Sequence, residues 1–384
     1  MTSQMKVMFT TAAPDIGGIL TDITNLCCGL IEEGEILPEI CCLGPCDQRL
    51  GEPFESRGIS FHRVQCPMKN HVQFTREFAR ILKAAAPDIL DIWSHLSLMG
   101  QTIAARIARV PAVTTRTYYY SPRIKTRLAR CIQTLAPLRL IHSYTAISHA
   151  AASATTMAAK MAGTRVKVIY NGVDLNRFST RCLSQHDARV YLGLPEHGFI
   201  IGSIGRLSPE KGFPVLLRAA AQVLTARQDV TLAIGGGGRK ALPELIGLAE
   251  TLGIRDRTIF IGWIGEPEKF YRALDTLVVP SLSEGLCNVV LEGMASGLPI
   301  IASNVGGIPE ALGDAGKLVP PGKADPLAAA IIEVASDERL RAEMSEKALR
   351  QAQRFSVKSF VEAHVSLYQE LYEKKVLHRR HVRH

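Results

Sequence analysis

Arg206 and Lys211 stand five residues apart in the run 205–212, where an apolar stretch ends and a helical pattern begins. In open α/β sheets, ligands bind at the carboxyl ends of the strands. An arginine fork and a lysine point charge in such a turn can meet one pyrophosphate. Because many surface loops also contain arginine and lysine, this pair predicts a diphosphate site only together with other residues.

Glu284 and Glu292 stand eight residues apart across a second loop and the helix that follows it. This spacing does not place them on one helical face, but they can hold opposite ends of one ligand. The helix start between them offers free N–H groups and a positive dipole end to a phosphate. Carboxylates near a helix start are also commonly simple partners of the helix dipole, and the two residues alone do not separate these interpretations.

Two further turns follow apolar strands in the same half of the chain. The run 235–238 consists of four glycines, and Gly262-Trp263 follows the strand at 258–261. The glycines do not fit the G-x-G-x-x-G pattern of a first βα unit, so a dinucleotide fingerprint is a weak interpretation. A tight turn close to a nucleotide explains them better.

Short apolar strands alternate with helical patterns along the whole chain, which predicts parallel sheets covered by helices. The pattern restarts after the turn at 171–174, so we expect two domains, as the length of 384 residues also suggests. We expect strands at 6–10, 36–43, 59–64, 89–93, 112–115, 144–147, 166–169, 199–203, 231–234, 258–261, 276–279, 300–302 and 317–319. Helices are expected at 18–32, 72–86, 101–108, 150–162, 213–226, 243–252, 267–273, 288–295, 324–335 and 356–374.

The charge distribution is uneven, with a formal net charge of +9 and no Asp or Glu between Asp91 and Asp174. A surface with this composition attracts phosphates, anionic lipid or nucleic acid, although a solvated basic face without a partner is the alternative. The stretch 92–173 holds eleven cations, namely Arg106, Arg109, Arg116, Arg123, Lys125, Arg127, Arg130, Arg139, Lys160, Arg165 and Lys167.

The remaining composition predicts a cytosolic protein. The apolar runs are strand-sized, and the N-terminus goes into a strand without an apolar segment of signal-peptide length. The nine cysteines show neither a disulfide framework nor paired C-x2-C zinc spacing, so we expect buried free thiols.

The run 281–299, continued by 304–310, resembles the E-x7-E region of retaining GT-B glycosyltransferases of the family 4 type. Gly17-Gly18, 170–174, Gly205-Arg206 with Lys211-Gly212, and 316–322 agree with this family in order and spacing. The resemblance implies two Rossmann-like domains facing a cleft. It implies an acceptor-side domain at 1–174, a nucleotide-sugar domain at 175–355, a helix at 356–376 that crosses back, and a basic tail at 377–384.

The resemblance also implies roles for the charged residues. Arg206 and Lys211 would neutralise the diphosphate of the donor, which is also the leaving group. Glu292 would hold the ribose hydroxyls, and Glu284 would bind hydroxyls of the transferred sugar. Transfer in this family retains the anomeric configuration, generally without a metal, so neither a metal nor a cofactor is expected.

The rest of the implied donor site consists of backbone and small groups. The N–H groups of Val289 and Val290 would face the phosphates, and residues near Gly262 and Trp263 would border the base. The same site is expected to include Gly17, Gly18 and Asn288.

The departures from the family pattern concern the acceptor. Where the family often has a histidine after the strand at 112–115, this chain continues Arg116-Thr117-Tyr118, and only His95 follows the preceding strand. His95 is either the catalytic acceptor-side imidazole or a packed structural histidine. The donor nucleotide is expected to be UDP, by family habit.

We expect transfer to a lipid-linked or envelope glycan, with the stretch 92–173 docking on the inner face of an anionic membrane. A small soluble acceptor is the alternative. A nucleotide-sugar epimerase and a basic module that binds nucleic acid are less favoured, because the latter leaves the Glu284/Glu292 and Arg206/Lys211 arrangement unexplained.

Overall fold

The computed structural model describes residues 4–12, 18–44, 51–66, 70–95, 97–118, 140–158, 165–179, 183–238 and 240–377. Gly17, all six lysines and arginines of the stretch 123–160 and the tail at 378–384 lie outside these residues. The chain forms two compact units. One consists of Met1–Gly172 with Val357–His384, and the other of Val173–Ser356.

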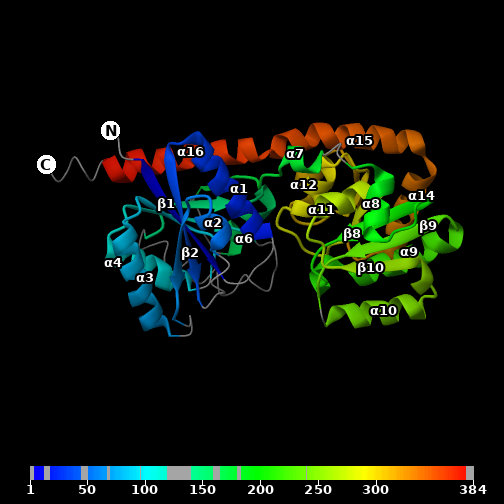
Figure 1. The fold of residues 1–384 in the computed structure, drawn as a ribbon, viewed down its shortest axis with the longest axis horizontal. Coiled ribbons are helices and arrows are strands. Elements are labelled where there is room, and N and C mark those ends of the chain that lie inside the picture. Colours follow the sequence, from blue (N-terminus) through cyan, green and yellow to red (C-terminus); the bar gives the residue numbers. More distant parts are fainter. Residues whose placement is uncertain are drawn as a thin grey trace. The chain divides into compact units, whose positions relative to one another are not determined.

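The first unit is built on a parallel sheet, which in the described residues has the strand order β3-β2-β1-β4-β5-β6-β7 (Figure 1). This order follows from right-handed crossovers that run outward in both directions from β1. The strands are β1 (Met5–Ala12), β2 (Ile36–Leu43), β3 (Ser60–Val64), β4 (Ile89–Ile92), β5 (Ala112–Thr117), β6 (Ser143–Ala146) and β7 (Val166–Val168).

Helices cover both faces of this sheet. Alternate residues of a strand point to opposite faces, and in β4 each face contacts a different set of helices. Leu90 and Ile92 pack into the core under α3 and α4. Asp91, between them, points to the opposite face, where its carboxylate accepts a hydrogen bond from Tyr368 of α16. The helices are α1 (Gly18–Glu33), α2 (Glu52–Glu55), α3 (His71–Ala85), α4 (Leu98–Ala108), α6 (His149–Ala158) and α16 (Val357–Leu371), which ends in a π-helical turn (Tyr372–Leu377).

The second unit repeats the plan with the strand order β10-β9-β8-β11-β12-β13, again all parallel (Figure 1). Its strands are β8 (Phe199–Ile204), β9 (Val230–Gly235), β10 (Thr258–Gly262), β11 (Thr276–Val279), β12 (Ile300–Ser303) and β13 (Lys317–Val319). Its helices are α7 (Leu175–Phe178), α8 (Gln185–Leu192), α9 (Phe213–Ala226), α10 (Ala241–Thr251), α11 (Pro267–Ala273), α12 (Asn288–Ala295), α13 (Ile308–Leu312), α14 (Ala324–Ser336) and α15 (Glu338–Ala352), with 3-10 turns at Pro209–Lys211, Arg255–Arg257 and Gln353–Phe355.

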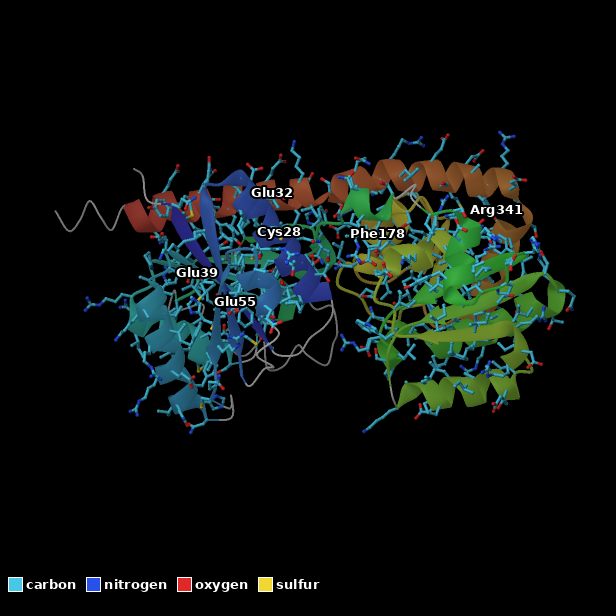
Figure 2. The ribbon with its side chains drawn as sticks, in the orientation of Figure 1. Cys28, Glu32, Glu39, Glu55, Phe178 and Arg341 are labelled. Atoms are coloured by element: carbon cyan, nitrogen blue, oxygen red, sulfur yellow. The ribbon has the colours of Figure 1, made fainter. Side chains whose placement is uncertain are left out.

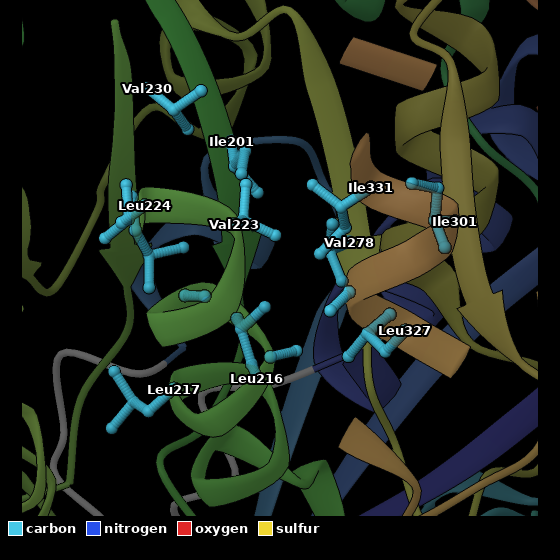
Figure 3. Close-up of a cluster of buried hydrophobic side chains, with 14 of the residues drawn as sticks. Ile201, Leu216, Leu217, Val223, Leu224, Val230, Val278, Ile301, Leu327 and Ile331 are labelled. Atoms are coloured by element: carbon cyan, nitrogen blue, oxygen red, sulfur yellow. The ribbon is translucent and has the colours of Figure 1, made fainter. Parts of the chain in front are cut away.

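The core of the second unit fills the space between the sheet and the helices α9 and α14. Ile201, Val278 and Ile301 project from three strands toward Val223 of α9 and Ile331 of α14 (Figure 3). All five side chains are fully buried, so this close-packed layer holds the strands β8, β11 and β12 against the two helices. The prediction of two parallel α/β sheets is confirmed.

A buried polar network joins α16 to the sheet of the first unit. The guanidinium of Arg116, at the end of β5, is fully buried and donates to Ile169 O at 2.9 Å and Asn171 Oδ1 at 2.8 Å. It also lies 3.2 Å from His364 Nε2 and 4.9 Å from the centroid of the Trp93 ring. Arg116 therefore does not belong to the basic surface to which the sequence assigned it.

The tautomer of His364 follows from its second nitrogen. His364 Nδ1 lies 2.9 Å from the carbonyl oxygen of Phe360, and a carbonyl can only accept, so Nδ1 carries the proton. Nε2 is then free to accept from Arg116. Burial, with the nearby positive charge of Arg116, lowers the pKa of His364 well below its ordinary value, so the ring stays neutral.

In the described part of the chain, no helix has both the length and the apolar character needed to cross a membrane. Among the described residues, Cys27, Cys28 and Cys287 are free thiols.

Candidate active site

The loops that follow β8, β9 and β10 meet at the carboxyl edge of the second sheet, because these strands are neighbours in its order. Hydrogen bonds connect them in series. Gly205 N donates to Gly235 O at 3.0 Å, and Gly236 N donates to Gly262 O at 2.7 Å. The glycine run at 235–238 thus forms the middle loop of three, as a tight turn at the strand end.

Lys211 and Glu284, which are 73 residues apart, form the centre of this edge. Lys211 Nζ lies 2.5 Å from Glu284 Oε1, and the same oxygen accepts a hydrogen bond from Ser281 Oγ at 2.8 Å. The side chains are 24% and 10% exposed, so the pair is only partly screened by water. The structure therefore brings together one cation of the first motif and one carboxylate of the second.

The charge state of Lys211 is set by two opposing effects. Burial alone would lower the pKa of its ammonium group, but the nearby carboxylate of Glu284 outweighs burial and leaves the pKa raised. Lys211 is therefore a fixed cation at neutral pH, held at the edge of the sheet by a carboxylate.

Two glycines allow the backbone to approach this pair closely. Gly212, directly after Lys211, has a φ of +71°, and a Cβ there would overlap the carbonyl oxygen of Pro280. Gly306 has a φ of +59°, and a Cβ there would overlap the carbonyl oxygen of Glu284. Both positions require glycine because the conformation is left-handed and the neighbour is rigid backbone.

The start of α12 lies beside Glu284. Cys287 forms the N-cap with a φ of +80° and is buried, and Asn288 is the first residue of the helix. The N–H of Val290 donates to Cys287 O at 3.0 Å. The roles of Asn288, Val289 and Val290 toward a phosphate stay predictions.

Glu292, one turn further along α12, is held by a residue that the sequence did not indicate. Tyr271 of α11 donates to Glu292 Oε2 at 2.6 Å. Phe178, labelled in Figure 2, packs edge-on against the Tyr271 ring with centroids 5.7 Å apart. Glu292 is thus fixed by α11 and α7, and no described hydrogen bond joins it to Glu284.

The carboxyl group of Glu292 is costly to ionise. Burial raises its pKa to about 7, although the Tyr271 hydrogen bond and the charge of Arg177 both act to lower it. A carboxylate that titrates near neutral pH in the free protein is typical of functional sites.

We predict that Glu292→Gln stabilises the protein at high pH. The folded pKa is about 7 against an ordinary value of 4.5, so the folded state binds the proton more tightly. The contribution of Glu292 to the free energy of unfolding is complete below its ordinary pKa of 4.5. This contribution is lost as the pH rises through the folded pKa of about 7. The wild-type free energy of unfolding should therefore fall by about 2 kcal/mol between pH 5 and pH 8 relative to the variant.

Urea unfolding of both proteins at the two pH values measures this difference. Glu343→Gln, which replaces a half-exposed glutamate of α15, is the matched control and should show no such pH dependence. Parallel curves for wild type and Glu292→Gln would contradict a raised pKa.

Three other predicted residues lie at the same edge. Arg206 is exposed in the loop after β8, and among the described residues it has no ion pair. Gly262 ends β10 with a φ of +81°, and Trp263 beside it is 67% exposed. An exposed tryptophan next to a glycine turn is a surface on which a flat ring can stack.

The remaining predicted residues belong to the first unit. Gly18 begins α1, and Gly17 lies outside the described residues. His95 follows β4, and burial lowers its pKa to about 4 despite a hydrogen bond with the backbone of Arg116. His95 is neutral at physiological pH, which suits either of the two interpretations given above.

Sequence reasoning missed three residues that build the site. Ser281 opens the same motif as Glu284, and its position three residues before a carboxylate was the available signal. The left-handed Gly306 lies in the continuation of that motif. Tyr271 gave no signal, because its partner is 21 residues away on another helix. In the described residues, no group of three or more His, Cys, Asp or Glu side chains could hold a metal ion.

Both halves of the chain match known families. Residues 184–351 match the family described as Glycosyl transferases group 1, and residues 16–177 match Glycosyltransferase Family 4. A D-inositol 3-phosphate glycosyltransferase of Saccharomonospora viridis is 37% identical over 217 residues, which are 53% of this chain and 50% of that protein. The chain thus spans about half the length of the curated relatives it matches.

Solved structures share the whole fold. HepE of Anabaena in complex with UDP and glucose has a TM-score of 0.81 at 26% identity and covers 96% of this chain and 100% of that one. Sucrose-phosphate synthase of Thermosynechococcus elongatus has a TM-score of 0.80 at 21% identity over 97% and 100% of the two chains. The second likeness concerns the fold alone.

Proposed function

This chain belongs to the family 4 type of GT-B glycosyltransferases, and we propose that it transfers a hexosyl group from a nucleotide-diphosphate sugar to an acceptor hydroxyl. The observation that carries the proposal is the contact of 2.5 Å between Lys211 and Glu284 at the strand edge. A cation fixed there can stabilise the charge that develops on a departing diphosphate.

The other edge residues receive roles that agree with their positions. Arg206, exposed and without a described ion pair, is available to the diphosphate as a second cation. Glu284 binds hydroxyls of the transferred sugar, and Glu292 accepts hydrogen bonds from the ribose. Trp263 and Gly262 border the base. Transfer proceeds with retention of configuration and without a metal.

We propose UDP as the nucleotide of the donor. Its support is the likeness to HepE, which was solved with UDP and glucose and covers 96% of this chain. The exposed indole of Trp263 offers a stacking surface to the base of such a donor.

Two acceptor classes remain, and each has an observation in its favour. The relatives named for D-inositol 3-phosphate favour a small soluble acceptor that carries a phosphate. The acid-free stretch 92–173 favours a lipid-linked acceptor in envelope glycan assembly, with the protein peripheral on the inner face of the membrane. We place the protein in the cytoplasm, where free thiols such as Cys27 and Cys28 persist.

Thermal shifts with UDP, GDP, ADP and NAD test the donor site. Ligand at about a hundred times its dissociation constant adds about 2.7 kcal/mol to the apparent stability. We expect this stabilisation with UDP and its loss in the variant Arg206→Ala/Lys211→Ala.

The matched control is Arg218→Ala/Arg339→Ala, which removes two cations from the outer faces of α9 and α15 and should keep the UDP shift. Stabilisation by GDP or ADP instead of UDP would overturn the choice of nucleotide. No shift with any of the four would overturn the donor site itself.

A further inference from the structure

The outer face of α4 is apolar although it is exposed. Met99, Ile103 and Ile107 are 38%, 41% and 48% exposed. They stand four residues apart and therefore form one row along the helix. The solvent face of a surface helix is normally polar, so this row needs a partner or an unusual environment.

A row of cations follows the neighbouring helix α3. Arg76, Arg80 and Lys83 are exposed and spaced by four and three residues, which places them on one face. The single acid of α3, Glu77, is engaged elsewhere, since its carboxylate accepts from the backbone N–H groups of Gln65 and Cys66. The formally charged side chains on the exposed face of α3 are therefore all positive.

The two helices lie side by side (Figure 1). A Cβ at Gly100 of α4 would lie 3.1 Å from the ring of Phe74 and 3.2 Å from Thr75 Oγ1 of α3, so little separates their backbones. Arg106 adds a fourth cation beside the apolar row, and α4 contains no acid. The α3–α4 face, meaning these two rows with Arg106, combines an apolar ridge with a positive flank.

We infer that the α3–α4 face docks on an anionic lipid bilayer. This inference rests on the proposed peripheral association and assigns it to a surface of which α4, but not α3, lies within the stretch 92–173. Apolar side chains in a row on a helix enter the boundary between headgroups and acyl chains, and flanking cations meet the negative headgroups.

The charge of the face argues against the other obvious occupant. A second copy of this chain that used the same face would bring two surfaces together whose charged side chains are all cations, with no acid on either side to offset them. Like charges brought together in an interface are strongly unfavourable. An anionic sheet of headgroups satisfies the cations and the apolar ridge together.

Vesicle co-sedimentation of the full chain at low salt tests the inference. We expect binding to vesicles of equal parts phosphatidylglycerol and phosphatidylcholine, and little binding to phosphatidylcholine alone. Removing the positive row by Arg76→Gln/Arg80→Gln/Lys83→Gln should weaken binding about 100-fold, roughly fivefold for each cation. Removing the ridge by Ile103→Ser/Ile107→Ser should weaken it about tenfold or more.

Matched controls exist in the second unit. Arg218→Gln/Arg339→Gln/Arg350→Gln removes three exposed cations, and Val190→Ser/Leu349→Ser removes two apolar side chains that are 56% and 42% exposed. Both control variants should bind vesicles like the wild type.

The inference is overturned if the α3–α4 variants bind as well as wild type, or if neutral and anionic vesicles are bound equally. It is also overturned if the ridge variant only dissociates an oligomer in solution, because the face would then be a protein interface. The UDP thermal shift should be unchanged in all these variants. Vesicle binding without any nucleotide response would instead contradict the proposed transferase and leave the docking surface intact.

Discussion

Glu284→Ala and Lys211→Met should each lower kcat for sugar transfer by about 10³-fold. The two side chains are in direct contact at 2.5 Å, and each is placed by the other. Lys211→Met removes the fixed cation that we propose for the leaving diphosphate while keeping most of the side-chain volume. Glu284→Ala removes the proposed sugar contact and also removes the partner that holds Lys211 in position. Initial rates of UDP release with saturating donor and acceptor measure both effects.

The double variant should be about as slow as the slower single variant, because residues that act as a unit lose their function together. Losses that multiply would show that the two side chains act independently and that their contact is incidental. Both single variants should keep a cooperative thermal transition, since the pair lies at a loop edge and not in the core. A variant without such a transition would show that the pair is structural.

Arg116→Met should destabilise the first unit by about 3–5 kcal/mol, since each buried acceptor left without its donor costs about 1–3 kcal/mol. The guanidinium is fully buried, and its loss leaves Ile169 O and Asn171 Oδ1 without their donor. The neutral Nε2 of His364 loses its donor as well. Methionine fills the volume but donates no hydrogen bond, so the buried acceptors keep their desolvation cost.

Urea unfolding followed by the fluorescence of Trp93, which packs against Arg116, measures this loss. The control Arg109→Met replaces an exposed arginine of the same unit and should change the stability by no more than about 0.5 kcal/mol. An Arg116→Met protein as stable as the control would mean that burying the guanidinium costs as much as its contacts contribute.

The buried strands were predictable because they are short, apolar and bounded by turns. The expected strands at 36–43, 276–279 and 317–319 agree with the structure in both bounds, and so do the helices at 213–226, 267–273 and 288–295. Expected bounds elsewhere differ by a few residues, where the pattern cannot show how far pairing continues.

The helix α15 escaped prediction because little of it is buried. Its sequence is polar all round, and ion pairs such as Arg339–Glu343 and Glu346–Arg350 support it on the outside. Only Met344, Ala348 and Ala352 are buried, and two of these are alanines. Its hydrophobic period is thus too weak to predict a helix, while its helix propensity is high.

The residues of the candidate site also fall into a group that the sequence could predict and a group that it could not. Residues that are close in sequence leave a signal there, such as Arg206 with Lys211. Even Ser281, which was missed, stands only three residues before Glu284. Contacts between distant segments leave no such signal, as Tyr271 with Glu292 shows. Arg116 was wrongly counted among the surface cations, because the composition of a stretch does not show which of its charged residues are buried.

The division of the chain into units also sets an order of events during synthesis. The second unit is one continuous segment, Val173–Ser356, and can fold as soon as it leaves the ribosome. Synthesis of the first unit starts earlier, but its folding ends last. Asp91 and Arg116 form their hydrogen bonds with Tyr368 and His364 only after α16 has been synthesised. The first domain to be translated is therefore the last to be finished. Until α16 leaves the ribosome, the carboxyl group of Asp91 and the guanidinium of Arg116 lack the partners that α16 supplies in the folded protein.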